Sequence, residues 1–579
     1  MEKILVAVAW PYVNGDIHPG HMAGYLLPAD IFARFNRLLG NYVLMVSGSD
    51  CHGTPITLQA DKEKVTPIEI VYKYHAKDIS LFKKLNLSYD IYTLTVTTNH
   101  ARIVQNMFLQ LLRNGYIYKS TMLQYYSSLD NKFLPDRYVE GKCPFCYAAK
   151  QRSDQCEICG HWIPDGQLIE PVSKLSGLPV ELKETQHYFF NFAALEKDLY
   201  SYVQSKKHVW KDWVYNESIG WLNKGLKSRA ITRDIDWGIS LPEEDLRDLQ
   251  NLQSSLNDIM LDNIQHKKIY VWFEAVVGYL SATIEWSQLD NNNMDNNLQK
   301  IYRRSQYYKN LYWEDFWFDT SSKHFYFMGQ DNLVFHTLMW PAQLIGTKLG
   351  YTLPYNVCVN KFLNLEGNKF SKSKGWTVDL SKLVDIYGVD EIRYYIASIL
   401  PENKESDFRW DSLVEKINNE LVGIIGNFIH RSLTLCINTL GRQLIFTPDL
   451  LRNDIQNILS STIKEYTKYI AECKFVDGLK LVLSLAKFGH KYFDESKVWT
   501  LKGGQSYSVF ANIFQIISIL SLLLFPFLPD GASKIREMIG LSKIEEVPGE
   551  NQLQYIPQLD FRLGDIKLLF KKIQSVQKC

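Results

Sequence analysis

Two apolar runs near the amino terminus, "KILVAVAW" (3–10) and "YVLMVSGSD" (42–50), decide the fold class. Each run is a nearly continuous series of aliphatic residues, which is typical of a parallel strand buried on both faces. Between them, apolar residues recur at helical spacing from Gly20 to Leu39, and a Gly-Asn pair ends that helix. The stretch predicts a strand–helix–strand unit and therefore a parallel α/β sheet with a right-handed crossover.

A ligand site is expected where these two runs end. In open parallel sheets, ligands bind beyond the carboxyl ends of the strands. Trp10, Tyr12 and His18 follow the first run, and the second run leads into residues 47–52. We therefore expect these aromatic and polar residues to lie at one edge of the sheet.

The composition is that of a soluble globular protein. Hydrophobic residues make up 46% and charged residues 22% of the chain, and the formal net charge is +1. No strong basic excess indicates a nucleic-acid partner, so RNA binding must rest on local patches. The amino-terminal apolar stretch is too short for a signal peptide, and Pro11 breaks it. The apolar run at 513–529 contains proline, which predicts a buried helix, no membrane span and a cytoplasmic location.

The length of 579 residues suggests roughly three or four domains. Strand-like runs return at 323–331 and 355–367, the Asn/Asp-rich segment 289–300 is typical of a surface loop, and helical spacing dominates from about residue 406. We expect the first half of the sheet in 1–115, an insert in 116–225, the second half in 226–405, a helix bundle in 406–530 and a helical carboxyl-terminal extension in 531–579.

The motif "HPGH" (18–21) follows the first strand and begins the expected helix. A helix N-terminus presents unpaired N–H groups that suit an anion, and two imidazoles can donate to phosphate oxygens. Gly20 lets a flat ring lie against the backbone, and Pro19 suits the first helical turn. The alternatives are two loop histidines without a chemical role, or a metal site, for which no third ligand lies close in the sequence.

A second motif, "GNKFSKSKGWTV" (367–378), places Lys369, Lys372 and Lys374 in a glycine-flanked loop after a late strand. Lysines in such a loop can neutralise a polyphosphate whose charge grows during a displacement reaction. Taken alone, the motif is better explained as a solvated basic loop.

Four of the nine cysteines, Cys143, Cys146, Cys156 and Cys159, form two C-x-x-C pairs. In a cytosolic chain this spacing favours metal over disulfides, and four thiolates suit tetrahedral zinc in a closed, structural site. The segment "EPVSKLSGLP" (170–179) contains no further pair, so one zinc ion is expected.

Together, the histidine and lysine motifs resemble the paired signatures of class I aminoacyl-tRNA synthetases. The methionyl-tRNA synthetase family in particular is similar over "AWPYVNGDIHPGHMAG" (9–24), "SGSDCHGTPI" (47–56), "YVWFEAVVGYLSA" (270–282), "FMGQDNLVFHTLMWPA" (327–342) and "KFSKSKG" (369–375). The likeness runs in order from about residue 3 to residue 530. It implies a Rossmann-type sheet, split by a zinc-containing connective-peptide insert and followed by an all-α anticodon-binding helix bundle.

The resemblance also implies which residues act. ATP, with Mg²⁺, would be held by His18, Gly20 and His21, and Lys369 and Lys372 would stabilise its triphosphate in the transition state. The methionine pocket would comprise Trp10, Tyr12, Asp50, Trp272, Ala275, Tyr279 and His336, with Asp50 pairing with the α-amino group. Without the resemblance, Trp272 and Tyr279 would be explained as core residues.

For the tRNA, the resemblance implies an anticodon site of Asn427, Arg431 and Trp499. Asn427 and Arg431 are four residues apart and share a helix face. An unstacked base can stack on an indole and be read along its edge by Asn and Arg side chains. The implied partners are tRNA(Met), ATP and L-methionine, and we expect a monomer.

Several positions depart from the usual family pattern, and none of them removes a charge or an imidazole. They are Pro19, Trp10, Val276, Asn332 and Phe370. One alternative is a class I synthetase for leucine or cysteine, but a large editing insert would exceed 116–225, and all four clustered thiols lie in the insert. The other is a tRNA-binding protein with a relic active site, against which the intact His18, His21 and Lys372 argue.

Overall fold

The computed structural model describes residues 1–578, except for 136–137, 154–155, 157, 160–162, 164–165, 175, 253–257, 290–299, 371–374 and 502–503. A six-stranded sheet with the order β13-β3-β2-β1-β14-β15 lies at its centre. Five of its strands run parallel: β1 (Lys3–Val8), β2 (Tyr42–Ser49), β3 (Ile91–Leu94), β14 (Lys323–Gly329) and β15 (Asn356–Asn360). The short edge strand β13 (Ile301–Tyr302) is antiparallel to β3.

The strand–helix–strand unit predicted from the first fifty residues is confirmed. After β1 the chain forms α1 (Pro19–His21), a π-helical turn η1 (Met22–Leu26) and α2 (Leu27–Leu38), and then returns as β2, parallel to β1. The strand order reverses direction between β1 and β14, so the crevice beyond their carboxyl ends is a topological switch point. Helices α3 (Thr54–Glu63), α4 (Pro67–Lys84) and α5 (Thr98–Arg113) follow.

A long excursion separates β3 from β14. Its core is an antiparallel sheet of β4 (Ile117–Ser127), β5 (Lys132–Phe133), β9 (Glu181–Phe190) and β10 (Arg229–Ala230), beside a small sheet of β6 (Val139–Lys142), β7 (Gln151–Arg152) and β8 (Ile169–Ser173). The remaining elements are α6 (Glu196–Ser205), α7 (Asp212–Asn223), β11 (Thr232–Asp234), α8 (Glu243–Leu252), β12 (Lys267–Ile269), α9 (Val271–Glu274), α10 (Gly278–Gln288) and α11 (Trp313–Trp317). The predicted surface loop 289–300 falls almost entirely outside the described residues.

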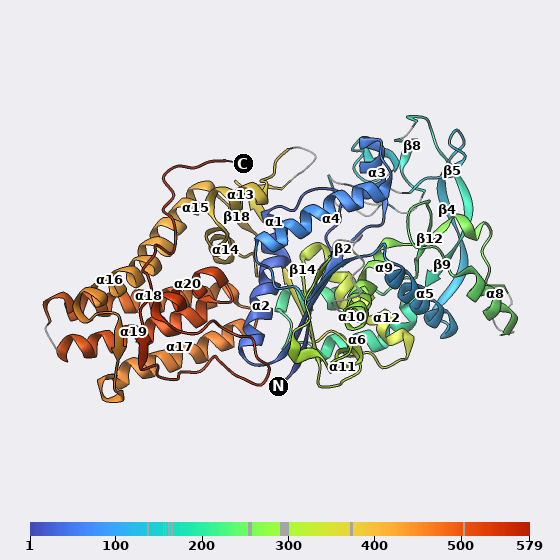
Figure 1. The fold of residues 1–579 in the computed structure, drawn as a ribbon. Helices are drawn as coiled ribbons and strands as arrows, with labels where there is room; N and C mark the ends of the chain where they lie inside the picture. The colour runs from blue at the N-terminus through green and yellow to red at the C-terminus, as the bar shows by residue number, and fades with distance from the viewer. Residues whose placement is uncertain are drawn as a thin grey trace.

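After β14 come the π-helical turn η9 (Phe335–Met339), α12 (Trp340–Thr347), β15, β16 (Leu363–Leu365), β17 (Asn368–Lys369), α13 (Leu380–Tyr387), α14 (Val389–Ser398) and β18 (Ser406–Phe408). The rest is mainly helical: α15 (Trp410–Glu415), η11 (Lys416–Gly426), α16 (Asn427–Leu440), α17 (Asn453–Ala471), α18 (Phe475–Ser496), α19 (Gly504–Leu524) and α20 (Pro529–Ile539). Figure 1 shows this bundle on one side of the central sheet and the β4–β9 layer on the other.

Two helical spans in the described part of the chain are long and apolar enough to cross a membrane, Trp410–Leu440 and Gln505–Leu524. The second is the more apolar, and 78% of its most apolar window is buried inside the protein. Its apolar surface is therefore used in packing the bundle, as the sequence predicts for a buried helix.

The prediction of a helical extension over 531–579 is wrong. Helix α20 ends at Ile539, and the described residues after it form one short strand, β20 (Asp560–Arg562), which pairs with β19 (Gln443–Ile445). The segment instead runs over the surface and bonds to earlier parts of the chain: the N–H of Gln552 donates to the Leu38 carbonyl at 2.8 Å. Prolines and glycines along 548–564 prevent a continuous helix.

A buried ion cluster joins α2, α14 and the end of the bundle. Asp30 Oδ2 accepts hydrogen bonds from Arg34 Nε at 3.0 Å and from Arg393 Nη2 at 2.7 Å. Its other oxygen accepts from the N–H and hydroxyl of Ser88, at 2.7 and 2.6 Å. Burial alone would raise the pKa of Asp30, but the two arginines and Ser88 hold it below its ordinary value.

Arg393 extends this cluster to the backbone of other segments. Its guanidinium, fully buried on α14, donates to the carbonyls of Leu85 at 3.1 Å, Pro526 at 3.0 Å and Phe527 at 2.7 Å. One side chain thus satisfies carbonyls after α4 and after α19, which would otherwise be buried without partners.

We predict that Asp30→Asn lowers the free energy of unfolding by about 3–5 kcal/mol, because two buried guanidinium groups lose their counter-charge. The measurement is urea denaturation followed by circular dichroism. The control is Asp454→Asn, which breaks a largely exposed pair with Arg452 and should leave the free energy of unfolding nearly unchanged. Equal, small effects of both changes would contradict this role of Asp30.

Candidate functional site

A cavity of about 420 Å³ lies beyond the carboxyl ends of β1, β14 and β15. Its lining includes Trp10, Tyr12, His18, Gly20, His21, Asp331, Lys361, Lys369 and Phe370. The histidine and lysine motifs, some 350 residues apart, therefore meet at one cavity. The expectation that polar and aromatic residues gather at this edge of the sheet is confirmed.

The histidine motif is a compact helix start. His18 is the N-cap of α1, and its Nδ1 accepts the N–H of Gly20 at 3.1 Å, while the His18 N–H donates to His21 Nδ1 at 3.2 Å. The two imidazole rings lie 4.0 Å apart. A Cβ on Gly20 would come within 2.8 Å of the His18 ring, so the close approach of ring and backbone requires glycine.

The lysine motif reaches the first motif through Phe370. The Phe370 ring stacks on His18 with centroids 4.7 Å apart and planes at 7°. Lys369 is exposed on β17, with its ammonium 5.4 Å from the Phe362 ring. Lys372 and Lys374 lie outside the described residues.

An aromatic cluster lies next to this cavity. The Trp10 indole lies against Gly48 and Gly278, where an added Cβ would come within 2.1 and 2.7 Å of it. Tyr279 lies edge-on to Trp10, and its hydroxyl is 2.7 Å from His336 Nε2. Burial lowers the pKa of His336 to about 4, and its Nδ1 lies 2.9 Å from the Asn332 carbonyl. The ring is therefore neutral at pH 7: its Nδ1–H donates to the Asn332 carbonyl, and its Nε2 accepts a hydrogen bond from the Tyr279 hydroxyl.

The other predicted aromatic residues form a second wall. Trp272 stacks on Phe335 at 4.4 Å between ring centroids and lies edge-on to Tyr12 at 6.1 Å. Ala275 begins the turn between α9 and α10, and Tyr279 lies in the first turn of α10. Of the predicted pocket residues, two follow β1 (Trp10 and Tyr12), one follows β2 (Asp50), three come from α9, α10 and the turn between them (Trp272, Ala275 and Tyr279), and His336 lies in the π-helical turn η9.

Asp50 follows β2 and is only 5% exposed. Its N–H donates to the Pro11 carbonyl at 2.9 Å, which ties it to the end of the first strand. Its Oδ1 is buried without a hydrogen-bond partner. Burial raises the pKa of Asp50 well above its ordinary value, and the neighbouring Glu274 carboxylate adds to the shift. A bound cation would supply the missing partner and favour the ionised form.

A buried triad beside Asp50 was missed by the sequence analysis. Glu274, fully buried, bonds His52 Nδ1 at 2.9 Å and His100 Nε2 at 2.6 Å, and His100 Nδ1 contacts Ser281 Oγ at 2.8 Å. Burial would raise the pKa of Glu274, but the two histidines hold it below its ordinary value. The one signal in the sequence was Glu274, an ionisable residue in the otherwise apolar run 270–282.

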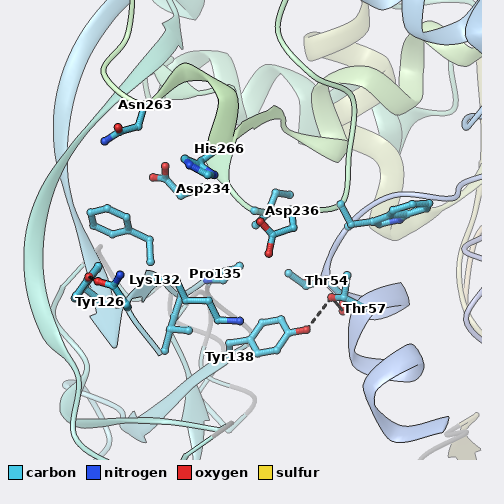
Figure 2. Close-up of a pocket in the computed structure, with 16 residues that line it drawn as sticks. Thr54, Thr57, Tyr126, Lys132, Pro135, Tyr138, Asp234, Asp236, Asn263 and His266 are labelled. Carbon is cyan, nitrogen blue, oxygen red and sulfur yellow. Dashed lines mark hydrogen bonds between the residues drawn. The ribbon is translucent and has the colours of Figure 1, made fainter. Parts of the chain in front are cut away.

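A larger cavity of about 520 Å³ lies between α3 and the insert (Figure 2). Figure 2 shows Tyr138 of the insert reaching Thr57 on α3, and the hydroxyl groups bond at 2.8 Å. Tyr126 and Lys132 line the insert side, and Asp236 faces the cavity from the opposite wall.

A cavity of about 80 Å³ lies between these two spaces. It shares Gly53, Thr54, Pro135 and Ile235 with the 520 Å³ cavity and Tyr12 with the cavity at the sheet edge. Arg233 and Trp272 also line it. Three neighbouring cavities therefore lie between the insert and the histidine motif.

The four predicted cysteines meet in the small sheet of the insert. All their sulfur atoms lie within 4.8 Å of one another, with Cys143 and Cys159 at 3.7 Å and Cys146 and Cys156 at 3.6 Å. The N–H groups of Phe145 and Cys159 point at the sulfurs of Cys143 and Cys156, each at 3.4 Å. The cluster can hold one metal ion.

In the bundle, the structure brings two of the three predicted residues to one aromatic ring. The Arg431 guanidinium lies 5.0 Å from the Phe493 ring, and the half-exposed Trp499 indole lies 5.8 Å from it. Arg431 also bonds His490 Nε2 at 3.1 Å and Asp494 Oδ1 at 3.3 Å. Asn427 is exposed at the start of α16, one helical turn before Arg431.

Comparison with known proteins identifies the family. The family model described as class I tRNA synthetases (M) matches residues 4–433. The chain belongs to the methionine-type class I tRNA synthetases. Curated family members named methionine–tRNA ligase are 38% identical to it: the one from Dehalococcoides mccartyi over 99% of this chain and 98% of its own length, and the one from Thermoplasma volcanium over 93% of each.

A solved structure of a family member has the same fold. The Mycobacterium tuberculosis methionyl-tRNA synthetase in complex with methionyl-adenylate superposes with a TM-score of 0.74 and 21% identity, covering 98% of this chain and all of that one. Its similarity extends from the α/β sheet to the helical carboxyl-terminal region.

Proposed function

We propose that the protein is a methionine–tRNA ligase. It activates L-methionine with ATP to methionyl-adenylate and pyrophosphate, and then transfers the methionyl group to the 3′ end of tRNA(Met). The observation that carries the proposal is the buried, unpartnered oxygen of Asp50, set between an aromatic cluster and the cavity of the histidine motif. These features suit an amino acid with a free ammonium group beside a nucleotide.

The finer architecture follows from this proposal. Residues 1–115 and 226–405 are the halves of a Rossmann-type catalytic domain, 116–225 is the connective-peptide insert, and 406–530 is the anticodon-binding bundle. The five parallel strands, interrupted by the antiparallel β4–β9 layer, support this division. Residues 531–579 form a separate carboxyl-terminal segment, whose described residues are not helical beyond Ile539.

ATP binds at the start of α1. His18 and His21 donate to phosphate oxygens, and Gly20 leaves room for the adenine or ribose to lie against the backbone. A methionine carboxylate oxygen attacks the α-phosphorus, and the bond to pyrophosphate breaks. Lys369 and Lys372 neutralise the charge that grows on the leaving group, and Mg²⁺ enters as the counter-ion of the ATP substrate.

Methionine binds at the aromatic cluster. Asp50 pairs with the α-ammonium, which relieves the cost of burying this carboxylate alone. Tyr279 and the neutral His336 form one wall, while Trp10, Tyr12, Trp272 and Ala275 surround a polarizable thioether. Little acid–base chemistry is required, because positioning and charge stabilisation supply most of the rate.

In the second step, a terminal ribose hydroxyl of the tRNA attacks the methionyl carbonyl, and AMP leaves. The adjoining cavities from the insert to Tyr12 support a route for this end from the insert to the methionine site. Aromatic side chains such as Tyr126 and Tyr138 can stack on unpaired bases, and Arg233 can contact a phosphate. At the other end, Trp499, Arg431 and Asn427 read the anticodon.

The metal is one structural Zn²⁺. Four thiolates about 2.3 Å from a tetrahedral zinc ion lie about 3.8 Å apart, and the spacings of 3.6 and 3.7 Å fit this geometry. The ion would fasten the turns of the small sheet in the insert. We further propose that the protein is a cytoplasmic monomer, with tRNA(Met), ATP and methionine as its partners.

The test of the proposal is amino-acid-dependent ATP–pyrophosphate exchange with all twenty amino acids. We expect exchange with methionine, and Asp50→Asn should lower kcat/KM for methionine by about 100-fold, or about 3 kcal/mol, because the ammonium loses its counter-charge. Asp258→Asn, at an exposed aspartate that pairs with Lys119, is the control and should have no effect. Faster exchange with leucine or cysteine would overturn the proposal.

For the metal, we predict about one equivalent of zinc per chain in the purified protein, measured by inductively coupled plasma mass spectrometry. Cys143→Ser should lose it, because three thiolates leave the tetrahedral site incomplete. Cys436→Ser, a buried cysteine of α16, should keep it. Full zinc content in the Cys143 variant would rule out the four-thiolate site.

For the anticodon site, we predict that Trp499→Ala weakens tRNA charging by roughly 10- to 100-fold while methionine-dependent exchange stays near wild type. The indole is half exposed, and a stacking platform contributes about 1–3 kcal/mol per base. Changing the first anticodon base should harm the wild type more than the variant. Tyr312→Ala, an exposed aromatic residue at the start of α11, is the control. Parallel losses of exchange and charging would mean that Trp499 serves packing instead.

A further inference from the structure

Two buried cysteines from distant parts of the chain meet where the bundle packs on the central sheet. Cys358 lies in β15, and Cys473 lies in the turn between α17 and α18. Their sulfur atoms are 3.0 Å apart, closer than the 3.6 and 3.7 Å within the four-cysteine cluster. The two residues are 5% and 2% exposed. No step of the proposed reaction uses them.

A third segment brings a cation to this pair. Lys211, at the N-terminus of α7, donates from its ammonium to the Glu402 carbonyl at 2.8 Å, the Val359 carbonyl at 3.0 Å and Asn360 Oδ1 at 3.2 Å. It is thus anchored to the two residues that follow Cys358. A neighbouring lysine favours a thiolate, whereas burial raises the pKa of Cys473 well above its ordinary value. Burial also lowers the pKa of Lys211, and its three hydrogen bonds to oxygen atoms hold the amine beside the pair.

Metal binding does not account for this arrangement. Among the described residues, the four cysteines of the insert form the one group of side chains placed to share a metal ion, and the pair is not part of it. The sulfurs instead face each other across a contact between β15 and the bundle, where Phe327 and Phe475 also meet at 6.4 Å. The 3.0 Å between the two sulfurs means that, once one of them is oxidised, the other is already within reach to attack it.

We propose that Cys358 and Cys473 form a reversible disulfide that fastens the bundle to β15 when the protein meets a hydroperoxide. One sulfur attacks a peroxide oxygen, the O–O bond breaks, and a sulfenic acid and water form. The second sulfur then displaces hydroxide from the sulfenic sulfur, which leaves as water. The two thiols lose two electrons and two protons, and hydrogen peroxide is reduced to two water molecules.

The bond would constrain the segment that lies between the two cysteines. This segment includes the lysine motif, α13, α14 and the first helices of the bundle. At its start, Asn360 Nδ2 donates to the Ala23 carbonyl at 3.0 Å, and Lys361 lines the cavity of the histidine motif. Closing a loop of this length restricts the unfolded chain, so the oxidised protein should resist thermal unfolding better than the reduced one.

The test is to treat the zinc-loaded protein with hydrogen peroxide, alkylate it under denaturing conditions with a chelator, and map the peptides by mass spectrometry. We expect the nine titratable thiols to fall to seven and a linked peptide pair containing residues 358 and 473 to appear. Dithiothreitol should restore all nine thiols. The melting temperature of the oxidised protein should rise, and the rise should vanish in Cys358→Ser and in Cys473→Ser.

Cys436→Ser is the matched control, because Cys436 is equally buried in the bundle and its sulfur has no described cysteine partner. This variant should form the 358–473 link as the wild type does. Peptide mapping of the wild type alone tests the proposal if a serine variant fails to fold. The proposal is overturned if peroxide links the cysteines of the insert while Cys358 and Cys473 remain free thiols, or if it converts either to a sulfinic acid without a link.

Discussion

The ionised carboxylate of Asp30 fixes the position of α14 and the helix bundle relative to α2 and the central sheet. It lies in a helix of the first strand–helix–strand unit, yet one of its two ion-pair partners, Arg393, belongs to a helix more than 350 residues later. Through that arginine it also fixes the backbone where the bundle turns back on the sheet. A carboxylate in this position is costly to bury, and it is tolerated because two guanidinium groups and Ser88 satisfy it fully.

The site itself depends on a contrast between two buried carboxylates. Glu274 is held ionised by two imidazoles, whereas Asp50, near it in the fold, keeps one oxygen without a partner. The negative charge of Glu274 makes the ionised state of Asp50 still less favourable in the empty protein. Binding of a cation is therefore coupled to ionisation of Asp50. The cation is favoured at one place, beside the Asp50 oxygen that has no other hydrogen-bond partner.

Residues close in sequence to a strong motif were predictable, and those placed by tertiary packing were not. The apolar runs at 3–10 and 42–50 predicted the parallel strands because burial on both faces leaves a continuous signal. The cysteine spacing likewise predicted a cluster. By contrast, nothing local indicates that His100 lies beside Glu274 or that Cys473 lies beside Cys358. The segment after Ile539 was assigned as helix because its surface path depends on partners elsewhere, such as Leu38 and Arg442.

The two larger cavities on either side of Tyr12 have a consequence for the order of events in the proposed reaction. The cavity at the start of α1 and the cavity beside the insert share no lining residue, and the 80 Å³ cavity between them reaches Tyr12. Under the proposed function, the tRNA end would therefore not have to displace a nucleotide from its own space before it docks.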